Sequence, residues 1–109
     1  MVVLESDAGV ARSVARHHLA RYLVLDNYRR SLLRLGFEPD DLERGGSDRL
    51  VDGLFAWGGP EAAAKRVAEH LAAGADHVCV QAYTADQEAG GGLPTLPRAA
   101  WRTLAEALL

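Results

Sequence analysis

The sequence predicts an α/β fold in which short parallel strands are joined by helices. An aliphatic, β-branched run opens the chain as "VVLE", and a second apolar run, "HVCVQAY", begins at His77. Between them, apolar residues recur at helical spacing over several segments. Because strands separated by helices pair in parallel through right-handed crossovers, we expect two parallel strands, at about residues 1–5 and 77–82, in a mostly helical domain.

Size and composition indicate a single soluble domain over residues 1–109. The chain is 49% hydrophobic and 25% charged, which are average values for globular proteins. It has no run of roughly 20 apolar residues and no signal-peptide pattern, so we expect no membrane association. The single cysteine, Cys79, cannot form an internal disulfide, which fits a reducing compartment. A cytoplasmic location is therefore expected.

The net charge of −3 is unevenly distributed along the chain. Residues 1–37 hold six arginines and three acids: Arg12, Arg16, Arg21, Arg29, Arg30, Arg34, Glu5, Asp7 and Asp26. A basic N-terminal third raises the hypothesis of nucleic-acid binding. The acidic remainder of the chain favours a solvated helix face instead, so no nucleic-acid partner is expected.

The first predicted helix follows the opening strand, with Ser6 or Asp7 as its cap. Two adjacent rows of residues form a broad apolar stripe along it: Val10, Val14, His18 and Tyr22, and Ala11, Ala15, Leu19 and Leu23. The arginines of this segment fall mostly outside the stripe.

Two shorter helices are expected next. One begins at Asp26 or Asn27 and ends at Gly36, and a helical turn follows from Pro39. The other begins after Ser47 and carries apolar residues at helical spacing, namely Leu50, Val51, Leu54 and Phe55. Its end, "LFAW", has the composition of a strand, but the period of four favours helix.

Residues 58–74 give the clearest helical pattern in the chain. Pro60 suits the first turn, Gly74 suits the end, and the expected buried face carries Ala63, Val67 and Leu71. After the second strand comes a loop with three consecutive glycines, Gly90–Gly92, which in a barrel would lie on the active-site face. A final helix over "RAAWRTLAEALL" places Trp101, Leu104 and Leu108 on one side.

Motifs for metal, nucleophile or phosphate chemistry are weak. His17 and His18 are adjacent on a helix and point about 100° apart, so they cannot hold one ion together, and no metal site is expected. Cys79, between two valines, is expected to be a small buried side chain. "GGP" before Glu61 lacks the spacing of a phosphate-binding loop and reads as helix initiation.

Three blocks taken together resemble the C-terminal part of the luciferase-like monooxygenases, and most closely their deazaflavin (coenzyme F-420)-dependent oxidoreductases. The blocks are "VVLESDAGVARSVARHHLARYLVLDNYRRSLLRLGF", "GGSDRLVDGLFAWGGPEAAAKRVAEHLAAGADHVCVQ" and "LPRAAWRTLAEALL". They cover nearly the whole chain, and the most specific part is the glycine-proline-glutamate helix followed by "GADHV".

This resemblance implies a TIM (β/α)₈ barrel, in which Val2–Glu5 would be the seventh strand and His77–Gln81 the eighth. The chain would then be the last two β/α units, a C-terminal quarter to third of the barrel. The resemblance also implies hydride transfer with reduced F-420 or FMN on an organic small-molecule substrate. In the family most cofactor contacts lie in the N-terminal half, so no catalytic residue is assigned, and the resemblance leaves open whether this chain binds F-420, FMN or no cofactor by itself.

The barrel rule places candidate cofactor-binding or substrate-lining residues at strand ends. These are Ser6 and Asp7 after the first strand, Gln81 and Tyr83 at the second, and Asn27 and Tyr28 in a loop between helices.

Exposed strand edges predict self-association or a partner that completes the barrel. The alternative function is a non-catalytic interaction module. A further alternative is a mostly helical miniature domain in which the strands have no structural role.

Overall fold

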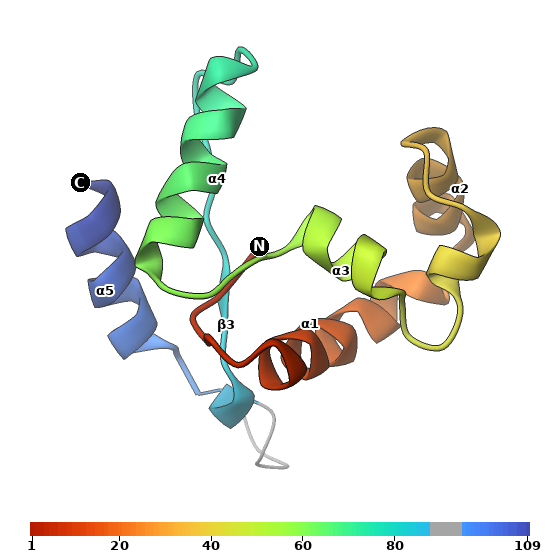
Figure 1. Ribbon diagram of the computed structural model, residues 1–109, viewed down its shortest axis with the longest axis horizontal. Helices are drawn as coiled ribbons and strands as arrows, with labels where there is room; N and C mark the ends of the chain where they lie inside the picture. Colours follow the sequence, from red (N-terminus) through yellow and green to blue (C-terminus); the bar gives the residue numbers. More distant parts are fainter. Residues whose placement is uncertain (88–94) are drawn as a thin grey trace.

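Short strands alternate with helices, and the strands meet in one parallel sheet between two helical layers (Figure 1). The computed structural model describes residues 1–87 and 95–109. Within these residues the elements are β1 (Val2–Val3), α1 (Ala8–Leu23), α2 (Asp26–Arg34), the 3-10 turn η1 (Pro39–Leu42), α3 (Asp48–Leu54), β2 (Ala56–Trp57), α4 (Pro60–Ala72), β3 (Ala82–Tyr83), the 3-10 turn η2 (Ala85–Gln87) and α5 (Arg98–Leu108). The fold is therefore mixed α/β, as predicted.

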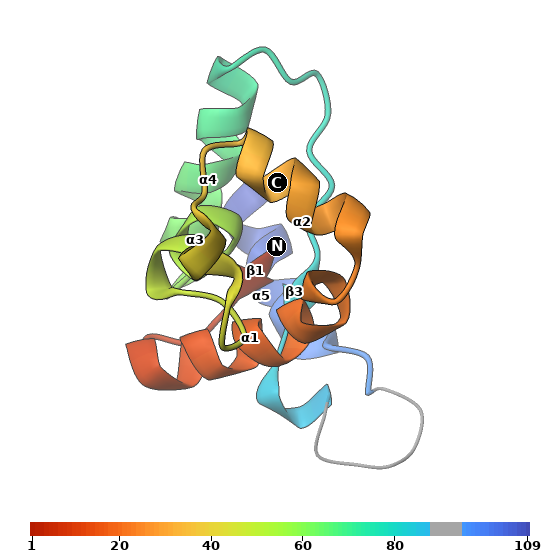
Figure 2. The same ribbon diagram turned by 90° about the vertical axis from the view of Figure 1, so that its right-hand side faces the viewer.

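The central strand of the sheet is β1, and the strand order is β2-β1-β3, with both pairings parallel. Val3 stands opposite Trp57 on one side and Tyr83 on the other. The pairing with β2 includes a hydrogen bond from the Ala56 amide to the Met1 carbonyl oxygen, at 2.9 Å. Both figures show the N-terminus in the middle of the molecule (Figure 2), because the first strand is flanked by the other two.

The two faces of β1 belong to two separate hydrophobic cores. Val3 packs into the larger core with residues of α1, α2 and α3, whereas Val2 packs into the smaller core with residues of α4 and α5. Successive side chains of a strand point to opposite faces, so two adjacent valines are enough to anchor both layers. Figure 1 shows this division, with α4 and α5 on one side of the strands and α1 and α3 on the other.

The handedness of parallel connections explains the two layers. The chain moves from β1 to β2 in one direction across the sheet and from β2 to β3 in the opposite direction. Because both crossovers are expected to be right-handed, their helices must lie on opposite faces. The α1–α3 group accordingly covers one face and α4 the other, where it packs against α5.

Local sequence signals fix the starts of two helices. The Asp7 carboxylate accepts a hydrogen bond from the Val10 amide at 2.9 Å, and the Ser47 hydroxyl accepts one from the Leu50 amide at 3.0 Å. Gly46, just before Ser47, has φ +104°, and a Cβ there would come within 3.2 Å of the Leu50 side chain. Only glycine allows this turn to lie against α1.

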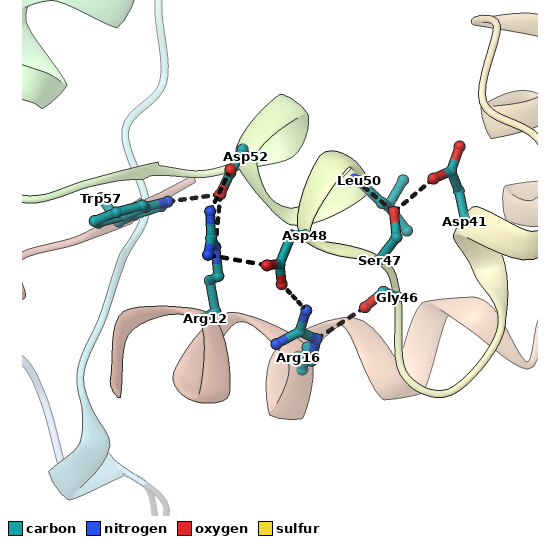
Figure 3. A network of polar contacts seen from close by, with 9 residues as sticks. All are labelled: Arg12, Arg16, Asp41, Gly46, Ser47, Asp48, Leu50, Asp52 and Trp57. Carbon is teal, nitrogen blue, oxygen red and sulfur yellow. Dashed lines mark hydrogen bonds and ion pairs between the residues drawn. The ribbon is translucent and has the colours of Figure 1, made fainter. Parts of the chain in front are cut away.

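A charged network joins α1 to α3 and β2 (Figure 3). Arg12 donates from Nε and Nη2 to the Asp52 carboxylate, at 3.1 and 2.7 Å, and also pairs with Asp48 at 2.9 Å. The Trp57 indole donates to the same Asp52 carboxylate at 2.8 Å, and Arg12 lies over the Trp57 ring. The hydrogen bond from Arg12 is the main cause that lowers the pKa of Asp52. Arg16 pairs with Asp48 and donates to the Gly46 carbonyl oxygen at 2.8 Å.

The pairing of early arginines with later acids explains the uneven charge of the sequence. Arg12 and Arg16 meet acids of α3, and Arg29 meets Glu43 at 2.7 Å. These arginines and acids are therefore ion-pair partners in the folded chain, although they are far apart in the sequence.

The predicted strands need three corrections. The prediction of helix through "LFAW" was wrong: α3 ends at Leu54, Phe55 is extended (φ −115°, ψ 135°) and Ala56–Trp57 form a third strand, because pairing with β1 outweighs the helical spacing. The opening strand is confined to Val2–Val3. The last strand is Ala82–Tyr83 and not residues 77–82, because the register Val2↔Ala82 places 77–81 beyond the start of β1, with no strand opposite them.

Several burial predictions also change. Cys79 was expected to be buried but is exposed, because the segment before β3 lies outside the paired part of the sheet. On α4 only Ala63 of the expected face is buried, and Leu71 is half exposed. On α5, Leu104 is buried while Trp101 is 46% exposed.

The predicted loop glycines, Gly90–Gly92, lie outside the described residues. Among the residues that are described, no helix has both the length and the apolar content needed to cross a bilayer.

Asp52→Asn should destabilise the fold by about 1–2 kcal/mol, because it weakens three hydrogen bonds at a partly exposed carboxylate. Urea unfolding at pH 7 measures the difference. The matched control is Asp26→Asn, whose ion pair with Arg30 is 3.7 Å long and exposed. Equal unfolding midpoints for the two variants would show that the network does not hold α1 against β2.

Candidate functional site

The strand order creates a switch point between β1 and β3. After β1 the chain turns to α1 on one face, whereas the helix that follows β3, α5, lies on the other face. Where successive connections diverge in this way, the carboxyl ends of the two strands leave a crevice, and open α/β sheets bind their ligands there. The fold therefore selects the carboxyl ends of β1 and β3 as the place to look for a site.

A cavity of about 270 Å³ lies at this position. We call it the switch-point cavity; its lining residues come from the end of β1, the first two turns of α1, and β3 with η2. They are Val3, Leu4, Glu5, Val10, Val14, Tyr83, Thr84, Ala85 and Asp86. Its lining combines polar and apolar surface in nearly equal shares, and the charged side chains among the described lining residues are two carboxylates.

The two carboxylates come from different elements. Glu5 lies two residues after the end of β1, and its Oε1 accepts a hydrogen bond from the Asp7 amide at 3.0 Å. Asp86 lies in η2, after β3. Within the described part of the chain, neither forms an ion pair, in contrast to Asp48 and Asp52.

Tyr83 forms the aromatic wall of the cavity. Its ring packs against His18 of α1, with centroids 3.7 Å apart, and its hydroxyl donates to the Gln81 side-chain oxygen at 3.0 Å. Phe55 lies further away, at 6.1 Å between centroids. Burial raises the pKa of the Tyr83 hydroxyl, so it stays neutral at physiological pH.

His18 is a buried polar residue behind this wall. It is 6% exposed, and its Nε2 atom has no hydrogen-bond partner among the described residues. Burial, followed by the charges of Arg21 and His17, lowers the pKa of His18 from 6.5 to about 4. The imidazole is therefore neutral at pH 7, and it places no positive charge next to the cavity.

The sequence-predicted site residues fall in different places. Tyr83 lines the cavity, whereas Ser6 and Asp7 follow β1 but do not line it, and Asp7 is used as the cap of α1. Gln81 precedes β3 and does not follow it. Asn27 and Tyr28 lie in the first turn of α2, and not in a loop as expected. Tyr28 connects to Tyr83 only through Tyr22 and His18, by successive ring contacts.

Several cavity residues were not predicted from the sequence. Glu5 was counted within the strand, and Asp86 was treated as loop. Val10 and Val14 belonged to the predicted apolar stripe, but that stripe does not tell which of its residues border a cavity. One signal in the sequence pointed to this part of α1: His18 lies in the same row of the stripe as Val10 and Val14, and a polar residue in an apolar stripe is unusual.

The cofactor implied by the resemblance does not fit this cavity. FMN and F-420 are both phosphorylated anions, and phosphate sites use cations or backbone amides. The described lining of the switch-point cavity contains Glu5 and Asp86 and no arginine or lysine. We therefore assign no cofactor phosphate to it.

A second cavity of about 270 Å³ lies beside β2 and α4. Its charged side chains already have partners within the protein. Arg66 pairs with Glu69 at 3.3 Å and donates hydrogen bonds to the carbonyl oxygens of Gly53 and Asp52. In residues 1–87 and 95–109, no three His, Cys, Asp or Glu side chains are grouped so as to hold a metal ion. The switch-point cavity is thus the better ligand site.

Comparisons of the chain with protein-family models, with curated proteins and with solved structures found no match. Functional inference therefore rests on the geometry of the site and on the sequence resemblance.

Protonation of His18 should destabilise the fold. Since its pKa is about 4 in the folded chain and 6.5 ordinarily, the unfolded chain binds this proton first. The contribution of the neutral His18 imidazole to the free energy of unfolding is fully present above pH 6.5. It is lost as the pH falls towards 4, by up to about 3 kcal/mol. Urea unfolding as a function of pH measures this loss.

His18→Phe keeps an aromatic ring against Tyr83 and should flatten the pH dependence over this window. His70→Gln, at an exposed position of α4, is the control and should behave as the parent chain does. An unchanged slope in His18→Phe would mean that the imidazole does not carry the effect.

Proposed function

We propose that this chain forms the substrate-binding part of a flavin- or deazaflavin-dependent oxidoreductase resembling the luciferase-like monooxygenases. The observation that carries the proposal is the switch-point cavity at the carboxyl ends of β1 and β3. Enzymes with parallel sheets assemble their sites at these ends. The resemblance supplies the reaction class, a hydride transfer between reduced cofactor and an organic substrate.

The division of labour follows from the charges of the cavity. The valines of its mixed lining and the Tyr83 ring suit the body of a small organic substrate. Its carboxylates disfavour the phosphorylated cofactor, which in this proposal is held by residues outside the cavity. The chain's task is then to bind and orient the substrate and to exclude water from it.

The TIM-barrel interpretation is part of this proposal only in a restricted form. Parallel pairing of β1 with β3 is compatible with the seventh and eighth strands of a barrel. However, β2 follows β1 in the chain and lies on its other side, where a sequential barrel has its sixth strand. The proposal therefore concerns the reaction class and the position of the site, and it does not require a closed barrel of regular strand order.

A fluorescence titration with FMN and with F-420 tests the proposal. We expect saturable binding of one cofactor that Val10→Phe, which narrows the cavity, leaves unchanged, because the cofactor lies elsewhere. Circular dichroism of the variant controls for folding. If neither cofactor binds to the parent chain up to about 100 µM, an estimate set by ordinary substrate-level affinities, the enzymatic proposal fails.

The second candidate is a non-catalytic interaction module, favoured by an apolar groove between α5 and the segment that precedes β3. The groove, of about 240 Å³, is lined by Val80, Trp101, Leu104, Ala105, Leu108 and Leu109. Both edge strands, β2 and β3, also have one side without a partner strand in the described sheet. Apolar grooves next to open edges favour association between chains.

Self-association of this kind should appear in light scattering as a mass above that of one chain at micromolar concentration. Trp101→Asp places a charge in the groove and should shift the population to monomer. Leu35→Asp, at the C-cap of α2 and 70% exposed, is the matched control. A monomeric parent chain, or equal effects of the two variants, would count against this second candidate.

A further inference from the structure

The charge of the switch-point cavity bears on the ligand it can take. Among its nine lining residues in the described part of the chain, Glu5 and Asp86 are the charged ones, and both are acids. A low-dielectric pocket lined by charges of one sign concentrates ligands of the opposite sign. The neutral His18 behind Tyr83 does not offset this negative charge.

These carboxylates differ from the other acids near α1. Asp48 and Asp52 are each held by arginine, as Figure 3 shows, and so contribute to the fold. Glu5 accepts one backbone hydrogen bond through Oε1, and among the described residues no hydrogen bond or ion pair engages its Oε2. Carboxylates in a partly apolar cavity whose described lining has no arginine or lysine are incompletely compensated, and a cationic ligand would compensate them.

The apolar part of the lining indicates the kind of uncharged body that the ligand can have. Val3, Val10 and Val14 offer aliphatic surface, and Tyr83 offers an aromatic ring, which also attracts cations through its electron-rich face or accepts an apolar ring edge-on. His18 covers part of this ring from the α1 side, at 3.7 Å between centroids. The cavity volume, about 270 Å³, lies just below the usual range of ligand pockets, which begins at roughly 300 Å³, and is too small for a nucleotide.

We propose that the switch-point cavity binds a small organic cation, namely an amine with a compact apolar or aromatic body. The ammonium group lies between Glu5 and Asp86, and the body lies against Val10, Val14 and Tyr83. This inference rests on the proposed role of the cavity as the substrate pocket, and it names the substrate class of that pocket.

The test uses three probes of nearly equal size that differ in charge: benzylamine, benzyl alcohol and benzoate. Calorimetric or NMR titrations of the full chain are made at pH 7 and low ionic strength. We expect saturable binding of benzylamine, at least about tenfold tighter than that of benzyl alcohol, weakened by added salt, and no binding of benzoate. Shifted NMR signals should map to Val10, Val14 and Tyr83.

Two variants remove one carboxylate each, Glu5→Gln and Asp86→Asn, and each should weaken benzylamine binding by about tenfold. Both variants should fold. The side-chain oxygen of the Glu5→Gln variant can still accept the hydrogen bond from the Asp7 amide, and Asp86 lies in an exposed turn. Asp76→Asn is the matched control: it changes the net charge equally, and its segment lies at the opposite end of the molecule from η2 (Figure 1).

The outcomes separate this inference from the proposed function. Equal binding of benzyl alcohol and benzylamine overturns the cationic class but keeps the cavity as a ligand site. A loss of affinity in Asp76→Asn as large as in Asp86→Asn also overturns it, because the effect would then be one of net charge. Binding of none of the probes overturns it as well, whereas a failure of the cofactor titration alone leaves it standing.

Discussion

The whole fold depends on the burial of two adjacent valines in one short strand. Val2 and Val3 point to opposite faces of the sheet, and each lies in a different hydrophobic core. Both neighbours of β1 in the sheet come from later in the chain. The strand that begins the sequence thus becomes the axis around which the two helical layers pack, and disrupting it would separate both layers at once.

The same arrangement produces the candidate site. With β1 in the centre, the chain must cross the sheet in opposite directions to add β2 and β3, and right-handed crossovers then put the helices on opposite faces. The divergence of the chain after β1 and β3 leaves the switch-point cavity between them. Site and fold therefore have one cause, and the network of Arg12, Asp48 and Asp52 contributes by holding α1 beside the sheet.

The switch-point cavity agrees with one expectation from the resemblance to the luciferase-like monooxygenases, the binding of an organic substrate, and disagrees with another, the binding of a phosphorylated cofactor. The position of the cavity, at the ends of parallel strands, suits an enzyme that binds an organic molecule. Its acidic character is unsuited to a phosphorylated cofactor, and the strand order differs from that of a sequential barrel. A substrate-side role accommodates both observations, and the apolar groove beside α5 provides an independent reason to consider association between chains.

The sequence by itself determined the helices and the class of the fold. Pro60, Gly74 and the cap Asp7 act through backbone geometry within a few residues, so their effects can be read locally. Only the tertiary structure decided that Ala56–Trp57 form a strand, that Cys79 is exposed and that Glu5, Asp86 and Tyr83 meet at one cavity. Strand pairing and cavities depend on contacts between residues far apart in the chain, and a local periodicity holds no information about which strand will lie opposite another.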